Sequence, residues 1–210
     1  MPRIILIIII SYLLGSIPTA YIFARLLKGV DIRKFGSGNV GATNAFRLLG
    51  KGWGITILIL DILKGFLPVI LLGDFFTKQL GLTQAQNIFI LIGLSCIAGH
   101  NWTIFLRFKG GKGVATTLGV LLGLAFKIPG LSLVLGLTVL VWFGSFFIAR
   151  IISLSSVLAA LSFPLFTILF RQSIIVISLG ILLSIFIILR HKSNIQRLLA
   201  GQESRISFKK

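Results

Sequence analysis

Long hydrophobic runs alternate with short polar stretches over nearly the whole chain, and this pattern predicts its helices. Most runs approach the ~20 apolar residues that an α-helix needs to cross a bilayer. We therefore predict an all-α, polytopic integral membrane protein with seven transmembrane helices. The predicted spans are residues 4–27, 53–72, 88–106, 114–126, 131–149, 151–170 and 173–189.

Two of these spans are irregular. The first contains the sequence Gly15-Ser16-Ile17-Pro18, and we expect a bend there because proline lacks the backbone N–H that a helix needs. Its apolar stretch extends well past the hydrophobic region of a signal peptide, so we interpret it as a retained helix. The fourth span, 114–126, is short, and the sequence leaves open whether it crosses the membrane fully.

The composition supports a membrane protein. Hydrophobic residues make up 56% of the chain and charged residues 12%, and the mean hydropathy is +1.06. A soluble domain needs more polar surface than this composition can provide. Cys96 is the only cysteine, which excludes an internal disulfide and any Cys-x-x-Cys metal or redox site.

The distribution of basic residues predicts the orientation. The chain has 21 Lys and Arg residues against four Asp and Glu, a net charge of +17. In a soluble protein this excess would indicate nucleic-acid binding, but at membrane ends it sets topology and faces anionic lipid headgroups. Sixteen of the basic residues fall on one predicted side and four on the other. The positive-inside rule then places the N-terminus outside and the C-terminus in the cytoplasm.

This orientation depends on the fourth span. If residues 114–126 formed a re-entrant helix, everything after Gly113 would change sides and the asymmetry of charge would be lost. With seven spans, the whole chain, 1–210, forms a single membrane domain. Its cytoplasmic loops cover about 28–51, 107–113 and 190–210.

A glycine-rich, cationic turn, Arg107–Gly113, lies between two apolar runs. Glycine lets a ligand approach the backbone, and a helix that begins at Val114 would direct its unpaired N–H groups and the positive end of its dipole at an anion. With Lys109 and Lys112, these groups predict a phosphate-binding loop that is not a P-loop. The alternative is a short cationic loop that only marks the cytoplasmic side. The expected backbone contacts come from Gly110, Gly111 and Gly113.

The first cytoplasmic loop contains a second candidate stretch, Gly36–Arg47, which is rich in glycine, amide and hydroxyl residues. Such side chains supply neutral hydrogen bonds, and Arg47 can bind a phosphate through two parallel bonds. The alternative is a flexible connector, because linkers are also rich in Gly and Ser. Interleaved apolar residues favour a ligand loop at the membrane interface. The expected contacts in this loop are Gly38, Asn39, Gly41 and Thr43.

The tail carries a third cluster, Arg190–Arg197, which continues directly from the last span. On a helix, His191, Asn194 and Ile195 share one face, so His191 could carry a proton or donate to a phosphate. A basic juxtamembrane helix that binds anionic lipid fits the same residues. His100 is also open to two interpretations, of which a satisfied polar group is favoured over a ligand.

The four acidic residues lie far apart in the sequence, and no two have the spacing of a metal clamp. We therefore expect no metal site, no cofactor and no magnesium-dependent phosphotransferase chemistry. Asp61 and Lys64 lie three residues apart within a span, and an intramembrane charge is costly unless it is paired. Mutual neutralisation is the favoured interpretation, and a proton relay is the alternative.

Three long motifs carry a family resemblance. GSGNVGATNAFR at Gly36–Arg47, GHNWTIFLRFKGGKGVATTLG at Gly99–Gly119 and RHKSNIQRLLAGQ at Arg190–Gln202 resemble the three cytoplasmic motifs of the PlsY family. This family comprises bacterial membrane glycerol-3-phosphate acyltransferases that use acyl phosphate as the donor. The similarity extends along nearly the whole chain. Ser193 departs from the pattern, because the family has an acidic residue there.

The resemblance implies transfer of a fatty acyl group from acyl phosphate to the 1-hydroxyl of sn-glycerol 3-phosphate. The products would be lysophosphatidic acid and phosphate, at the first acylation of phospholipid biosynthesis. The implied partners are the two substrates, the bilayer of the bacterial cytoplasmic (inner) membrane and the enzyme that makes acyl phosphate. The residues implied to line the site are Ser37, Arg47, Lys112, His191 and Asn194.

The resemblance also implies roles for these residues. Arg47 and Lys112 would bind the phosphates, and Ser37 with the loop N–H groups would face the donor phosphate or the developing oxyanion. His191 and Asn194 would orient glycerol 3-phosphate. We expect no carboxylate base. Asp31 is the acidic residue nearest to the candidate loops in sequence, and the others lie in a span, on the outer side or in the distal tail. A membrane transporter for phosphorylated anions remains an alternative, although the clear internal repeats expected of a transporter are not evident.

Overall fold

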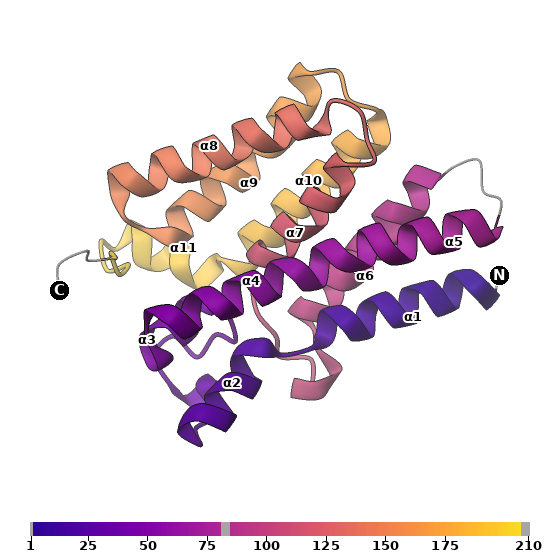
Figure 1. Cartoon of the computed structure of the whole chain (residues 1–210). Helices are drawn as coiled ribbons and strands as arrows, with labels where there is room; N and C mark the ends of the chain where they lie inside the picture. The colour runs from indigo at the N-terminus through magenta and orange to yellow at the C-terminus, as the bar shows by residue number, and fades with distance from the viewer. Residues whose placement is uncertain (1, 81–84, 207–210) are drawn as a thin grey trace. The chain divides into compact units, whose positions relative to one another are not determined.

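The structure is a computed structural model that describes residues 2–80 and 85–206 (Figure 1). These residues form helices joined by turns, with no β-strand among them, which confirms the predicted all-α class. The last four residues of the predicted tail, 207–210, lie outside the described residues. The chain divides into two compact units, residues 1–127 and 128–210, and each is described by itself.

The first unit contains the helices that carry two of the three candidate loops. Most are α-helices, whereas η1 and η3 are 3₁₀ turns and η2 is a π-helical segment. Its elements are α1 (Pro2–Ser16), α2 (Thr19–Lys28), η1 (Ile32–Lys34), α3 (Ala42–Leu49), α4 (Lys51–Leu67), η2 (Pro68–Leu72), α5 (Gly73–Leu80), α6 (Ala85–Asn101), η3 (Ile104–Leu106) and α7 (Val114–Ala125).

The break predicted in the first span is confirmed. Helix α1 ends at Ser16 and α2 begins at Thr19, so Ile17 and Pro18 lie between them. Pro18 cannot donate a backbone hydrogen bond, and it disfavours the helical conformation at the residue before it. The break gives the first span two separate segments, and the second one, α2, leads into the first candidate loop.

Small residues set the distances between the helices of the first unit. Helix α1 packs against α6 and α4 against α7. A Cβ added to Gly15 would lie 2.1 Å from the carbonyl oxygen of Cys96, and one added to Gly119 would lie 1.9 Å from that of Ile62. The backbones therefore touch at both crossings, which is the packing that small residues allow in membrane helices. The contact between α4 and α7 fixes where α7 begins.

The second unit comprises α8 (Leu131–Ala149), α9 (Ile152–Leu169), α10 (Ile174–Arg190) and α11 (Lys192–Leu199). Helix α9 packs against both α8 and α10. Helices α10 and α11 are bent by 64° with respect to each other, with His191 between them. The sequence motif had been interpreted as a direct continuation of the span, so this bend is a correction.

The number of helices that can cross a membrane is lower in the structure than the predicted seven. Five helices of the described chain are long and apolar enough, and the bent pair α10 and α11 would make six. Helix α7 has 12 residues, about 18 Å at 1.5 Å per residue, which is shorter than a ~30 Å hydrocarbon core. Seven spans, and the orientation derived from them, therefore stay predictions.

Candidate active site

The glycine-rich loop, residues 107–113, folds back onto the C-terminal end of α6. The backbone N–H of Gly110 donates to the carbonyl of Asn101 (3.2 Å), and that of Gly111 donates to the carbonyl of His100 (3.1 Å). Phe108 donates to Thr103 at 2.9 Å. The bonds to Asn101 and His100 satisfy carbonyl groups that the end of α6 leaves without partners. The loop therefore has a defined path over the end of α6.

Two positions in this loop have no room for a side chain. A Cβ added to Gly110 would lie 2.0 Å from the carbonyl oxygen of His100, and one added to Gly111 would lie 2.1 Å from Nε2 of the same histidine. Helix α7 begins at Val114, directly after the loop, and no side chain caps its N-terminus. The prediction that a helix starts at the end of this loop is confirmed.

The two lysines of the loop differ in exposure. Lys112 is partly buried between Gly111 and Gly113, both of which are buried, whereas Lys109 is exposed. A cation held beside the first N–H groups of a helix adds to the positive end of the helix dipole. Lys112 has the position expected of a phosphate ligand, and Lys109 that of a residue at the rim.

Asn44 in α3 organises the other candidate loop of this unit. Its buried side-chain amide donates to the carbonyls of Ile32 (3.2 Å), Phe35 (2.9 Å) and Asn39 (3.1 Å). Its Oδ1 accepts the backbone N–H of Ser37 at 3.2 Å. Asn44 thus connects to both sides of the turn that carries Ser37. Asn44 was not among the residues predicted for the site, because a run of Ser, Thr and Asn does not show which of them points inward.

The other candidate residues in this loop are more accessible than Asn44. Ser37 and Arg47 are exposed, and Gly38, Asn39, Gly41 and Thr43 are partly buried. The loop shares a hydrophobic core with the glycine-rich loop. Leu106, directly before that loop, is buried in one cluster with Val40 and Ala45. One core of the first unit therefore supports both loops.

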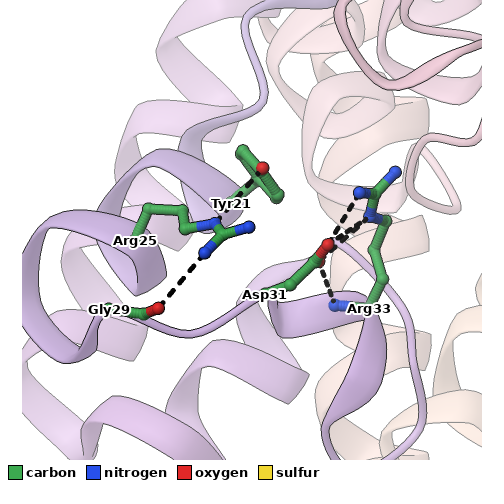
Figure 2. Close-up of polar contacts among 5 residues, drawn as sticks. All are labelled: Tyr21, Arg25, Gly29, Asp31 and Arg33. Atoms are coloured by element: carbon green, nitrogen blue, oxygen red, sulfur yellow. Dashed lines mark hydrogen bonds and ion pairs between the residues drawn. The ribbon is translucent and has the colours of Figure 1, made fainter.

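Two arginines, Arg25 and Arg33, lie near Tyr21 in the part of the chain before this loop (Figure 2). Asp31 accepts hydrogen bonds from the side chain of Arg33, the shortest 2.7 Å long, and these bonds hold the pKa of that carboxyl at about 2. The guanidinium groups of Arg25 and Arg33 lie 5.7 and 5.3 Å from the centre of the Tyr21 ring. Cation–π contacts of this kind fix arginines in place.

The second unit carries His191 and Asn194, and both are buried. Nδ1 of His191 lies 2.8 Å from the carbonyl oxygen of Ile187. A carbonyl oxygen only accepts hydrogen bonds, so Nδ1 donates this one. His191 is held at the bend between α10 and α11, whereas Asn194 lies within α11.

Glu203 contacts Asn194, although the sequence analysis placed this residue in the distal tail, away from the candidate loops. Its carboxylate accepts hydrogen bonds from the Asn194 amide (2.5 Å), the Ser153 hydroxyl (2.8 Å) and Arg197 (2.7 Å). Burial alone would raise the pKa of Glu203, but these hydrogen bonds outweigh it and lower the pKa. Glu203 thus joins the tail to α9 and α11.

Replacing Glu203 by glutamine is expected to destabilise the second unit by about 2 kcal/mol, since charge-assisted hydrogen bonds to three donors are weakened. The loss would appear as a lower midpoint of thermal unfolding in detergent. Because the folded pKa is lowered, the stabilisation by this carboxylate is fully present above its ordinary pKa of 4.5 and is lost as the pH falls through the lowered pKa of the folded state. An unchanged midpoint at neutral pH would show that the tail does not depend on this carboxylate.

The four acidic side chains, all within the described residues, form ion pairs. Asp31 pairs with Arg33, Asp61 with Lys64, Asp74 with Lys127 and Glu203 with Arg197, with the closest atoms 2.7–2.8 Å apart. The pairing predicted for Asp61 and Lys64 is confirmed. Within residues 2–80 and 85–206, no three His, Cys, Asp or Glu side chains are grouped as metal ligands would be.

Comparison with known proteins identifies the family. A family model described as glycerol-3-phosphate acyltransferase matches residues 5–201. The glycerol-3-phosphate acyltransferase of Desulforudis audaxviator (strain MP104C) is 42% identical over 207 residues, which cover 99% of this chain and 98% of that protein.

The solved structures that match are crystal structures of PlsY, an integral membrane glycerol 3-phosphate acyltransferase. Its glycerol 3-phosphate form has a TM-score of 0.84 and 40% identity, covering 98% of this chain and 96% of that one. Its lysophosphatidic acid form has a TM-score of 0.81 with the same identity and coverage. The chain therefore belongs to the PlsY family of integral membrane glycerol-3-phosphate acyltransferases, as its three motifs had indicated.

Proposed function

We propose that this protein transfers a fatty acyl group from acyl phosphate to the 1-hydroxyl of sn-glycerol 3-phosphate in the bacterial cytoplasmic membrane. The products are lysophosphatidic acid and inorganic phosphate. The observation that carries the proposal is the glycine-rich loop. This loop presents Lys112 beside the start of α7. The whole chain is 40% identical to a protein whose structure was solved in a glycerol 3-phosphate form and a lysophosphatidic acid form. This similarity favours acyl transfer over transport of phosphorylated anions.

The chemistry of the two substrates supports this assignment. Each carries a phosphate, and the chain has cationic loops built from glycine and neutral hydrogen-bonding residues. We assign the phosphates to Arg47 and Lys112, whose charges give strong hydrogen bonds to phosphate oxygens. Ser37 and neighbouring N–H groups face the donor phosphate or the oxyanion, and His191 and Asn194 orient glycerol 3-phosphate. The further contacts are those of Gly38, Asn39, Gly41, Thr43, Gly110, Gly111 and Gly113.

The reaction breaks one bond and forms one. The hydroxyl oxygen of glycerol 3-phosphate attacks the acyl carbon, and the bond from that carbon to the bridging oxygen breaks. Phosphate leaves with the electron pair of that bond. Acyl phosphate already contains a good leaving group, so the protein has to align the hydroxyl with the carbonyl and stabilise the oxyanion. One proton must also leave the hydroxyl.

The proton acceptor in this proposal is a phosphate oxygen of the bound substrates. Each carboxylate of the chain is already ion-paired, and the pKa of Asp31 and that of Glu203 are both lowered, which makes them weak bases. A phosphate monoester titrates near pH 6, so its dianion is a competent base. His191 is the alternative acceptor.

The variant His191→Gln separates these acceptors. If a phosphate oxygen takes the proton, turnover at saturating substrate should fall by less than about a hundredfold and the pH profile should keep its shape. Measurement of kcat against pH in the purified variant checks this. Abolished turnover while glycerol 3-phosphate still binds would identify His191 as the base.

A donor assay tests the proposed function. Purified protein in detergent is given glycerol 3-phosphate with acyl phosphate, acyl-CoA or acyl carrier protein charged with the same chain. We expect lysophosphatidic acid from acyl phosphate only. Efficient use of acyl-CoA or of acyl carrier protein would contradict the proposed donor. A lack of product with all three donors, from protein that is folded, would contradict acyl transfer itself.

A further inference from the structure

An ion pair lies inside the fourth helix, away from the residues assigned to substrate. Asp61 Oδ1 and Lys64 Nζ in α4 are 2.8 Å apart, and their side chains are 1% and 9% exposed. Both lie within the candidate membrane span Lys51–Gln79. Ionisable residues inside a membrane span are costly and usually have a functional reason.

This pair also contacts the break between α1 and α2. Lys64 Nζ donates to the carbonyl of Ile17 at 2.9 Å. The Thr19 hydroxyl donates to Oδ1 of Asp61 at 2.5 Å. Ile17 and Thr19 flank Pro18, where the first span is interrupted. Asp61 and Lys64 therefore hold the start of α2, the helix that leads into the loop carrying Ser37.

On its other side the pair faces His100, at the end of α6. Nδ1 of His100 lies 3.9 Å from Oδ1 of Asp61, too far for a hydrogen bond but close enough for an electrostatic interaction in a buried site. The same imidazole ring lies under the glycine-rich loop, because Nε2 occupies the space that a Cβ of Gly111 would need. The His100 carbonyl accepts the N–H of Gly111 as well.

Stability alone does not account for this arrangement. Replacing a buried ion pair by neutral side chains of similar volume is often neutral or stabilising. The helices already meet closely at α4 and α7, where Gly119 touches the Ile62 carbonyl. The pair adds electrostatic contacts to the start of α2 and to the end of α6. Each of these segments leads into a candidate loop. These contacts hold the two segments in a fixed position with respect to α4.

We propose that Asp61 and Lys64 are positioning residues for the phosphate-binding loop, acting through His100 on Gly111 and Lys112. This inference rests on the proposed function of that loop. Neither residue touches substrate in this scheme. Their role is to hold His100 under the loop, so that the N–H groups at the start of α7 and the Lys112 ammonium meet the phosphate together. Loss of the pair would shift the loop while the fold persists.

The test is the neutral double variant Asp61→Asn/Lys64→Met, which leaves no unpaired charge. We expect its KM for glycerol 3-phosphate to rise about tenfold, because small misplacements of binding groups are costly, with kcat within about threefold of the wild type. The matched control is Asp74→Asn/Lys127→Met, which removes another ion pair of the first unit, between α5 and the turn after α7. The control should leave both kinetic parameters unchanged.

A second variant keeps the test independent of how well the first one folds. His100→Gln alone should raise the same KM, and adding it to the neutral double variant should cause no further rise if the pair acts through His100. An unchanged KM in the folded double variant, or additive effects of the two changes, would overturn the inference. If instead Lys112→Ala leaves KM and kcat unchanged, the proposed role of the loop fails, and the inference fails with it.

Discussion

Lys112→Ala is expected to lower kcat/KM for glycerol 3-phosphate about ten- to a hundredfold, since a charge-assisted contact to phosphate contributes roughly 1.5–3 kcal/mol. Lys112 is partly buried between two buried glycines, next to the N-terminus of α7. This position places Lys112 beside the helix dipole and the first N–H groups of α7, which favour an anion, and solvent competes weakly there. Steady-state kinetics with both substrates measures the loss.

Lys109→Ala is the matched control. This lysine belongs to the same loop and carries the same charge, but it is exposed. We expect a loss below about threefold, because exposed charges are screened by water and salt. Equal losses at Lys109 and Lys112 would mean that the loop acts through its net charge, and the assignment of Lys112 as a phosphate ligand would be wrong.

Gly110→Ala is expected to lower kcat/KM about a hundredfold, the cost of displacing a binding group by about 1 Å. A Cβ at this position would lie 2.0 Å from the carbonyl oxygen of His100, and backbone cannot move aside as a flexible side chain can. The added methyl group would push the loop off the end of α6 and move Lys112 with it. The same kinetic assay, with thermal unfolding to confirm that the variant is folded, gives the measurement.

Gly52→Ala controls for the general effect of adding a methyl group. Gly52 lies in α4, and a Cβ there would meet no heavy atom within 4 Å. Alanine is also the better helix former, so this variant should be as active and as stable as the wild type. Full activity in Gly110→Ala would show that the loop tolerates displacement, and a rigid phosphate-binding loop would then be excluded.

The sequence predicted the helices well because hydrophobic runs and glycine or proline breaks act locally. The break at Pro18, the start of α7 at Val114 and the helix Leu131–Ala149 all follow from residues within one or two turns. The ion pair between Asp61 and Lys64 was predictable for the same reason, since residues three apart share a helical face. The family followed from three motifs and is confirmed by the comparisons.

The features that were missed depend on contacts between distant residues. Glu203 binds Ser153, 50 positions earlier, and no periodicity relates the two. Asn44 reaches back to Ile32 because the intervening turn folds around it. The bend at His191 interrupts a run whose residues are compatible with one helix. The roles of Ser37, Arg47, Lys112, His191 and Asn194 stay proposals, to be decided by kinetics.

The central claim is that the hydroxyl of glycerol 3-phosphate attacks the acyl carbon of acyl phosphate. Acyl phosphate labelled with ¹⁸O at the oxygen between carbon and phosphorus tests this directly, with mass spectrometry of both products. We expect the label to be in inorganic phosphate, with one phosphate released for each lysophosphatidic acid formed. Label retained in a released fatty acid, with the phosphoryl group transferred to the acceptor, would contradict acyl transfer.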